Sequence, residues 1–161
     1  MAVNFKLQAN ADIVSKNISK YRTKLEQAIQ KGLLQAGFQL VTVMRELTKK
    51  GIDVNRNPFA PYSEQYLKQL NREGKPTTVD LFYTGRMLGS LTPSSSVKKS
   101  GRHKVSISFT NSQMRQRALF NQVLGEPKRE FFGFNNKTEK IINKQFNRFV
   151  EQELRKLRIW V

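Results

Sequence analysis

The chain has 161 residues, of which 38% are apolar and none is cysteine, so we expect one domain with a modest core and no disulfide, thiolate metal site or cysteine nucleophile. Its 29 Lys and Arg residues against 12 Asp and Glu residues give a net charge of +17, which predicts long-range attraction to polyanions such as DNA. No apolar run approaches the ~20 residues that span a bilayer, and the first ten residues lack the basic and apolar regions of a signal peptide. We therefore expect a cytosolic protein that has no membrane partner.

The N-terminal third is expected to be mainly helical. Residues 3–7 alternate between apolar and polar, which predicts a short strand. A long helix is then expected over residues 13–48, as one helix or two in series. Gly32 and Gly37 permit either a kink or close packing against a neighbour. The apolar positions that recur at helical spacing are Leu25, Ile29, Leu33, Ala36, Leu40, Val43 and Leu47.

Short elements and irregular segments are expected in the middle of the chain. Gly51–Pro61 holds two prolines and two asparagines and is predicted to be a loop. Ser63 can cap a short helix that ends at Gly74, and Thr84 can cap another. The buried side of this second helix is predicted to carry Met87, Leu88 and Leu91. The Ser- and Lys-rich segment Pro93–Gly101 is predicted to be the mobile tip or edge of a hairpin. We expect both this segment and the loop 51–61 to make subunit contacts.

The C-terminal part begins with the clearest strand pattern, in which Val105, Ile107 and Phe109 alternate with polar residues. A helix is expected over Gln113–Leu124, and a short strand over Glu130–Phe134. The residues predicted to lie inside the first of these are Ala118, Leu119 and Val123. A last helix is expected over residues 137–157, with an apolar stripe of Ile141, Ile142, Phe146, Phe149, Val150, Leu154 and Leu157. A helix, a strand-centred middle and a second helix indicate an α+β fold.

Residues suited to catalysis or metal binding are few. The only histidine, His103, has no nucleophile or carboxylate at a recognised spacing, and a surface residue beside a turn is the simpler interpretation. Glu151 and Glu153 fall on different sides of a helix, so they form no carboxylate cluster. Gly85 and Gly89 form neither a nucleotide-binding fingerprint nor a P-loop. We therefore expect no enzyme, and no catalytic, cofactor-binding or metal site.

The densest basic group lies on the predicted hairpin and comprises Lys98, Lys99, Arg102 and Lys104. Few aromatic residues interleave with these four, so a solvated face is favoured over dedicated DNA recognition. A ring through which DNA passes would also need a positive lining, and it would need no stacking aromatic residues. The four residues are therefore candidates for non-specific contact with DNA in such a lumen.

Three segments carry motifs in a fixed order. Residues 57–61 read Asn-Pro-Phe-Ala-Pro, residues 81–91 read Leu-Phe-Tyr-Thr-Gly-Arg-Met-Leu-Gly-Ser-Leu, and residues 127–134 read Pro-Lys-Arg-Glu-Phe-Phe-Gly-Phe. Over roughly residues 57–153 the chain resembles the virion morphogenesis and tail-completion (neck) proteins of tailed bacteriophages. In that family a Pro-Phe-x-Pro-Leu-Ser run, a Leu-x-x-Thr-Gly-Arg-Leu-x-x-Ser signature and a Pro-x-Arg-x-Phe-Leu-Gly run follow in this order. Members often carry a His-x-x-Gly stretch before the last run, where this chain has Asn-Gln-Val-Leu-Gly at residues 121–125.

The resemblance implies a long N-terminal helix and a C-terminal helix packed on a small antiparallel sheet, as a single domain over residues 1–161. It implies a structural virion protein, assembled in the host cytoplasm, that forms a ring of six or twelve subunits at the head–tail junction. Such a ring links the head connector to the tail tube or terminator and needs no cofactor. The residues that match the motifs, and that we expect to build the fold and the ring, are Pro58, Phe59, Pro61, Thr84, Gly85, Arg86, Ser90, Pro127, Arg129, Phe131 and Phe132. The alternative is a small basic protein that binds DNA without sequence preference.

Overall fold

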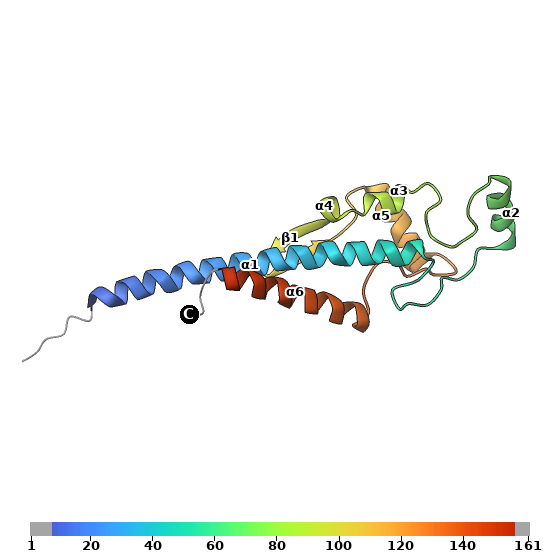
Figure 1. Cartoon of the computed structure of the whole chain (residues 1–161). Helices are drawn as coiled ribbons and strands as arrows, with labels where there is room; N and C mark the ends of the chain where they lie inside the picture. Colours follow the sequence, from blue (N-terminus) through green and yellow to red (C-terminus); the bar gives the residue numbers. More distant parts are fainter. Residues whose placement is uncertain (1–7, 157–161) are drawn as a thin grey trace, which may run out of the picture.

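A single long helix is the main axis of the molecule, and α2 (Glu64–Arg72) with its flanking loops extends beyond its C-terminal end (Figure 1). The computed structural model describes the backbone of residues 8–156 and the side chains of residues 18–156. Helix α1 spans Gln8–Lys49 without interruption, which decides between the two predicted alternatives, and its first turns project beyond the other elements. The strand predicted at residues 3–7 lies outside the described residues.

The sheet and the last helix pack on two sides of α1 (Figure 1). Strands β1 (Val97–Gly101) and β2 (Lys104–Ile107) form an antiparallel hairpin on one side. Helix α6 (Asn136–Lys156) runs back along another side. The predicted α+β class, with a long N-terminal helix, a C-terminal helix and a small antiparallel sheet, is therefore confirmed, and α1 lies between the other two parts.

Two glycines of α1 allow these neighbours to approach closely. A Cβ atom at Gly32 would lie 3.0 Å from side-chain carbons of Phe146 and Val150 on α6. A Cβ atom at Gly37 would lie 2.6 Å from a methyl carbon of Val97 on β1. The glycines are five positions apart, so at 100° per residue they point about 140° apart around the helix. The predicted close packing is confirmed, and α1 is not broken at either glycine.

Five short helical segments complete the fold. They are α2 (Glu64–Arg72), α3 (Arg86–Ser90), α4 (Pro93–Ser96), α5 (Ser112–Leu119) and the π-helical turn η1 (Phe120–Leu124). Ser63 caps α2 by accepting a hydrogen bond from the Tyr66 amide, as predicted. The core gathers where these segments meet the hairpin and the second half of α1. Its buried residues include Val41, Met44, Leu88, Leu91 and Phe131.

The predicted apolar stripe of α1 is wrong in its phase. Its members are half-buried, or exposed in the case of Leu25, whereas the buried positions are Ala28, Val41, Met44 and Thr48. Because α6 and the hairpin pack on different sides of α1, the most apolar side of the helix falls between the two contacts. The described members of the α6 stripe are likewise half-buried, or exposed in the case of Ile141, since that helix packs mainly on α1.

Two further predictions about helices are wrong. Gly85 and not Thr84 is the N-cap of α3, and the cap makes no side-chain hydrogen bond. In α5, Ala118 is buried as predicted, but Leu119 and Val123 are 50% and 49% exposed. The buried residues Met114 and Ala118 are four positions apart and mark the buried side of α5. Leu119 follows Ala118 directly and therefore points about 100° away from that side. The wider π-helical turn that follows displaces Val123 from that side as well.

The structures of two segments, residues 93–101 and 130–134, differ from the predictions made for them. Pro93–Gly101 is not the tip of the hairpin and not a loop, because residues 93–96 form α4 and residues 97–101 form the hairpin strand β1, as the alternative of a hairpin edge predicted; Ser96 and Val97 are buried. Residues 130–134 form no strand, because their backbone bonds to a loop and to a side chain instead of to a sheet; the Glu130 carbonyl, for example, accepts from the Val54 amide at 2.9 Å. Gly51–Pro61 is a loop, as predicted, and it is anchored by the buried Phe59.

Candidate functional site

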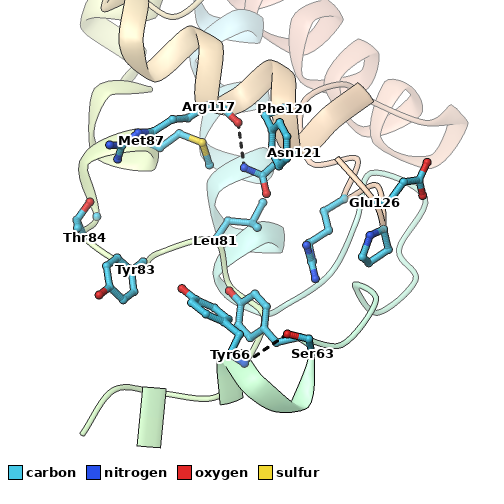
Figure 2. Close-up of a pocket in the computed structure, with 14 residues that line it drawn as sticks. Ser63, Tyr66, Leu81, Tyr83, Thr84, Met87, Arg117, Phe120, Asn121 and Glu126 are labelled. Atoms are coloured by element: carbon cyan, nitrogen blue, oxygen red, sulfur yellow. Dashed lines mark hydrogen bonds between the residues drawn. The ribbon is translucent and has the colours of Figure 1, made fainter. Parts of the chain in front are cut away.

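The second and third motif segments, and the residues that follow the first, converge on one open groove (Figure 2). The groove has a volume of about 480 Å³. In Figure 2, Ser63 and Tyr66 lie on one wall, and Arg117, Phe120 and Asn121 lie on the opposite wall. Of the eleven residues predicted to build the fold and the ring, those that line it are Thr84, Gly85, Pro127 and Arg129. We refer to this cavity as the motif groove.

Arg129 ties the third motif to the first. Its Nε donates to the Ala60 carbonyl at 3.2 Å, and its terminal nitrogen donates to the Pro61 carbonyl at 3.1 Å. The guanidinium carbon lies 5.1 Å from the centre of the Tyr62 ring, a cation–π distance. A planar donor fork suits two successive carbonyl groups better than a lysine would. The first motif also holds itself together, because Pro58 pairs across the loop with Ile52.

Gln122 orients the third motif, a role that the sequence did not reveal. Its Oε1 accepts from the amides of Phe131 at 3.0 Å and Phe132 at 2.9 Å, and its Nε2 donates to the Phe132 carbonyl at 3.1 Å. Gln122 stands three residues before Gly125, which is the spacing of the His-x-x-Gly stretch that this chain lacks. That spacing was the one available signal for a structural residue at this position.

The aromatic pair of the third motif anchors it in the core. Phe131 is 1% exposed, and its ring centre lies 6.3 Å from that of Phe109, directly after β2. Phe132 is half-buried and lies 5.6 Å from the same ring. Edge-on and tilted arrangements at these distances favour aromatic packing. Both phenylalanines therefore contribute to the fold, whereas Phe134, in the same motif, is exposed.

The central motif shapes the turn into α3. Gly85 has a φ of +68°, and a Cβ atom there would lie 2.9 Å from the ring of Phe82, so the position favours glycine on two counts. Ser90 donates from its hydroxyl to the Met87 carbonyl at 2.8 Å and closes the helix. Arg86 is exposed and makes no side-chain hydrogen bond or ion pair among residues 18–156, so its motif role is not explained by contacts within the subunit.

Tyrosines form the wall of the groove at α2. The rings of Tyr62 and Tyr66 meet edge-on at 4.8 Å, and Tyr83 lies 6.4 Å from Tyr66. Burial raises the pKa of both Tyr62 and Tyr66, so these phenols stay neutral at physiological pH. The Tyr83 hydroxyl donates to Glu73 at 2.8 Å. Bonds from Lys75 and from other donors lower the pKa of Glu73 to about 2, and the resulting carboxylate–ammonium pair lies outside the groove, which neither residue lines.

An exposed apolar cluster borders the groove. Phe120 lines the groove and is 60% exposed, and Leu124 is 64% exposed. Together with Leu119 and Val123 these residues form what we call the apolar patch, on the last turn of α5 and on η1. The sequence pattern had assigned two of the four to the interior. Four large apolar side chains on two successive turns are typical of a protein interface.

The four basic residues of the predicted DNA lining do not share one surface. Lys99 and Arg102 line a hollow against α1, where Arg102 forms an ion pair with Glu26. The hydrogen bond from Arg102 lowers the pKa of Glu26. Lys98 is paired with Ser106, and since side chains alternate along a strand, it points to the other face of the hairpin from Lys99. Contact of these residues with DNA stays a prediction.

The groove offers hydrogen-bonding groups, aromatic faces and the guanidinium groups of Arg117 and Arg129. Among the residues that the structure describes, no three His, Cys, Asp or Glu side chains gather as a metal site would require. His103 is exposed in the turn between the strands. Within residues 8–156 no helix has the length and apolarity to cross a membrane. The arrangement can bind another chain, through the patch and the groove beside it.

Comparison with known proteins places no constraint on these interpretations, because no family model, no curated protein and no solved structure matches the chain.

Proposed function

We propose that the protein is a structural, non-enzymatic subunit of a tailed-phage particle. Copies of it form a ring of six or twelve at the head–tail junction, assembled in the host cytoplasm, which links the head connector to the tail tube or terminator. The proposal rests on the order of the three motifs, and the apolar patch is the observation that carries it. A surface of this kind is typical of a subunit that is completed by its neighbours.

The placement of exposed apolar residues favours a ring over a twofold dimer. Ile18, Tyr21 and Leu25 are exposed on the N-terminal half of α1, at the other end of the molecule from α5, which carries the patch (Figure 1). A twofold contact uses the same surface on both subunits, whereas a head-to-tail contact needs two different surfaces. Two separate apolar surfaces at opposite ends match the second case, and a head-to-tail contact closes into a ring when the rotation between neighbours allows it.

Removal of the patch is expected to abolish assembly but leave the subunit folded. In a Leu119→Ser, Leu124→Ser double variant, both replaced side chains are at least half exposed, so the thermal midpoint should change little. Electron microscopy and analytical ultracentrifugation of the unmodified protein, alone and with phage tails, should show rings that the double variant does not form. Phe134→Ser is the matched control, because it removes an equally exposed apolar side chain outside the patch. Rings of the double variant, or an unmodified protein that neither forms rings nor adds to tails, would contradict the proposal.

The alternative, a small basic DNA-binding protein, is favoured by the net charge of +17. If the structural proposal is right, the free protein should bind duplex DNA no more tightly than the ~10⁻⁴–10⁻⁶ M of non-specific binders at physiological salt, with no sequence preference. Fluorescence anisotropy with duplexes of different sequence measures both properties. Nanomolar, sequence-selective binding by the monomer would favour the alternative instead.

A further inference from the structure

Helix α6 carries a straight line of basic side chains along its outer side. These residues, which we call the basic stripe, are Lys137, Lys140, Lys144, Arg148 and Arg155. Their spacings of three, four, four and seven residues place them on one side of a helix. The stripe covers 18 residue steps, or about 27 Å at 1.5 Å per residue. All five residues are exposed, and none makes an ion pair with the carboxylates of residues 18–156.

The acidic residues of α6 are segregated from the stripe. Glu153 pairs with Lys31 of α1 at 3.8 Å. Glu139 is exposed, but its helical spacing places it on the same side of α6 as Glu153 and away from the stripe. Glu151 alone falls within the stripe, so its net charge is five minus one, or +4. The apolar side of the helix is occupied, because Phe146 and Val150 pack against α1 at Gly32. The outer side of α6 is therefore a concentrated positive surface without an internal counter-charge of equal size.

The chemistry of the stripe suits the phosphates of duplex DNA better than other polyanions. A helix that binds a membrane surface inserts its apolar side between the lipids, and here that side packs on α1. Recognition of carboxylates by a protein partner favours the bidentate fork of arginine, whereas three of these five residues are lysines, which act as mobile point charges. A duplex presents one charge per 1.7 Å of its axis, so a linear array of cations can contact several phosphates in any sequence.

We propose that the basic stripe is the surface with which the protein contacts the phosphate backbone of duplex DNA, without reading the bases. The stripe takes the place of the hairpin as the main DNA contact, since Arg102 of the hairpin is paired with Glu26 and Lys98 and Lys99 point to opposite faces of the strand. Contact of the stripe with DNA can be tested on the free subunit. A location of the stripe at the lumen of a ring, in contrast, rests on the proposed function.

Two variants that remove the same charge separate the two surfaces. One carries Lys137→Gln, Lys140→Gln, Lys144→Gln and Arg148→Gln, and the control carries Lys98→Gln, Lys99→Gln, Arg102→Gln and Lys104→Gln. Binding of a short duplex is measured by anisotropy between about 50 and 200 mM salt, where each lost phosphate contact lowers the slope of log K against log salt by about 0.9. Compared with the unmodified protein, the α6 variant should bind at least about tenfold more weakly, with a slope smaller by about 3 to 4. The hairpin variant should keep most of the affinity and most of the slope.

Equal losses of DNA affinity in the two variants would overturn the proposal, because they would show that DNA responds to the overall positive charge of the protein and not to one binding surface. Loss of affinity in the hairpin variant alone, no salt-dependent binding by the unmodified protein, or stronger retention of that protein on phosphatidylglycerol vesicles than on DNA would also overturn it.

Glu151→Gln keeps the test decisive if the fourfold variant does not fold. It raises the charge of the stripe from +4 to +5 and should tighten binding several-fold; unchanged or weaker binding would count against the stripe. If the protein forms rings but the stripe does not contact DNA, only the proposed DNA contact is contradicted. If the stripe contacts DNA but no rings form, only the proposed function is contradicted.

Discussion

Replacement of Phe131 by alanine is expected to lower the free energy of unfolding by about 3–5 kcal/mol, because truncation of a buried phenylalanine loses its transfer free energy and leaves a cavity. The side chain is 1% exposed and packs against the rings of both Phe109 and Phe132. A loss of this size is a large part of the 5–15 kcal/mol by which domains are stable. Chemical denaturation measures it as a lower midpoint with an unchanged slope.

Phe134→Ala is the matched control for this prediction. Phe134 belongs to the same motif, three residues further on, but its side chain is 58% exposed. Its truncation should change the stability of the free subunit by no more than about 0.5 kcal/mol. Similar losses from the two substitutions would show that the motif is not anchored by Phe131, and that the packing described for it is wrong.

The contrast between these two phenylalanines shows what the sequence could and could not predict. Helical periodicity was sufficient to predict the long first helix, the short helix after Ser63 and the last helix, because each is long enough or has a clear cap. The run from Glu130 to Phe134 has no such period, and its backbone bonds to a loop and to a side chain instead of to a strand. Which phenylalanine is buried therefore depends on contacts far along the chain.

The errors in phase have the same origin. Sequence periodicity assumes that a helix has one buried side, and α1 has two, because α6 and the hairpin pack on it at Gly32 and Gly37. In α5 the apolar residues Leu119 and Val123 fit the interior by pattern, yet they are exposed in the subunit. A sequence pattern cannot distinguish an apolar residue that is buried within its own subunit from one that a neighbouring subunit covers, as we propose for Leu119 and Val123.

The candidate site was predictable as a set of motifs but not as a groove. Thr84, Gly85, Pro127 and Arg129 were singled out by resemblance, and the structure brings all four to one cavity. The bonds of Arg129 to the carbonyls of residues 60 and 61 join segments that are nearly 70 residues apart, and no local pattern encodes such a contact. The basic stripe, by contrast, was visible in the sequence as helical spacing. Charge density alone favours the group on the hairpin, which has more charge per residue.

Gln122→Met is expected to destabilise the subunit by about 2–4 kcal/mol. The substitution conserves volume but removes the acceptor for the amides of Phe131 and Phe132 and the donor to the Phe132 carbonyl. A buried polar group left without a partner costs about 1–3 kcal/mol, and water can reach part of this half-buried site and reduce the total. Thermal and chemical denaturation measure the loss, and hydrogen exchange should show faster exchange at the two amides.

A graded pair of variants separates the three hydrogen bonds of Gln122 from its packing. In Gln122→Glu the carboxylate still accepts from both amides, but no donor faces the Phe132 carbonyl, so the loss should be smaller than in Gln122→Met. Gln113→Met makes the same chemical change at an exposed position of α5 and should be nearly neutral. If Gln122→Met were as stable as the unmodified protein, the third motif would be held by the packing of Phe131 alone. The order expected from the hydrogen bonds is therefore unmodified protein, Gln122→Glu and Gln122→Met, from most to least stable.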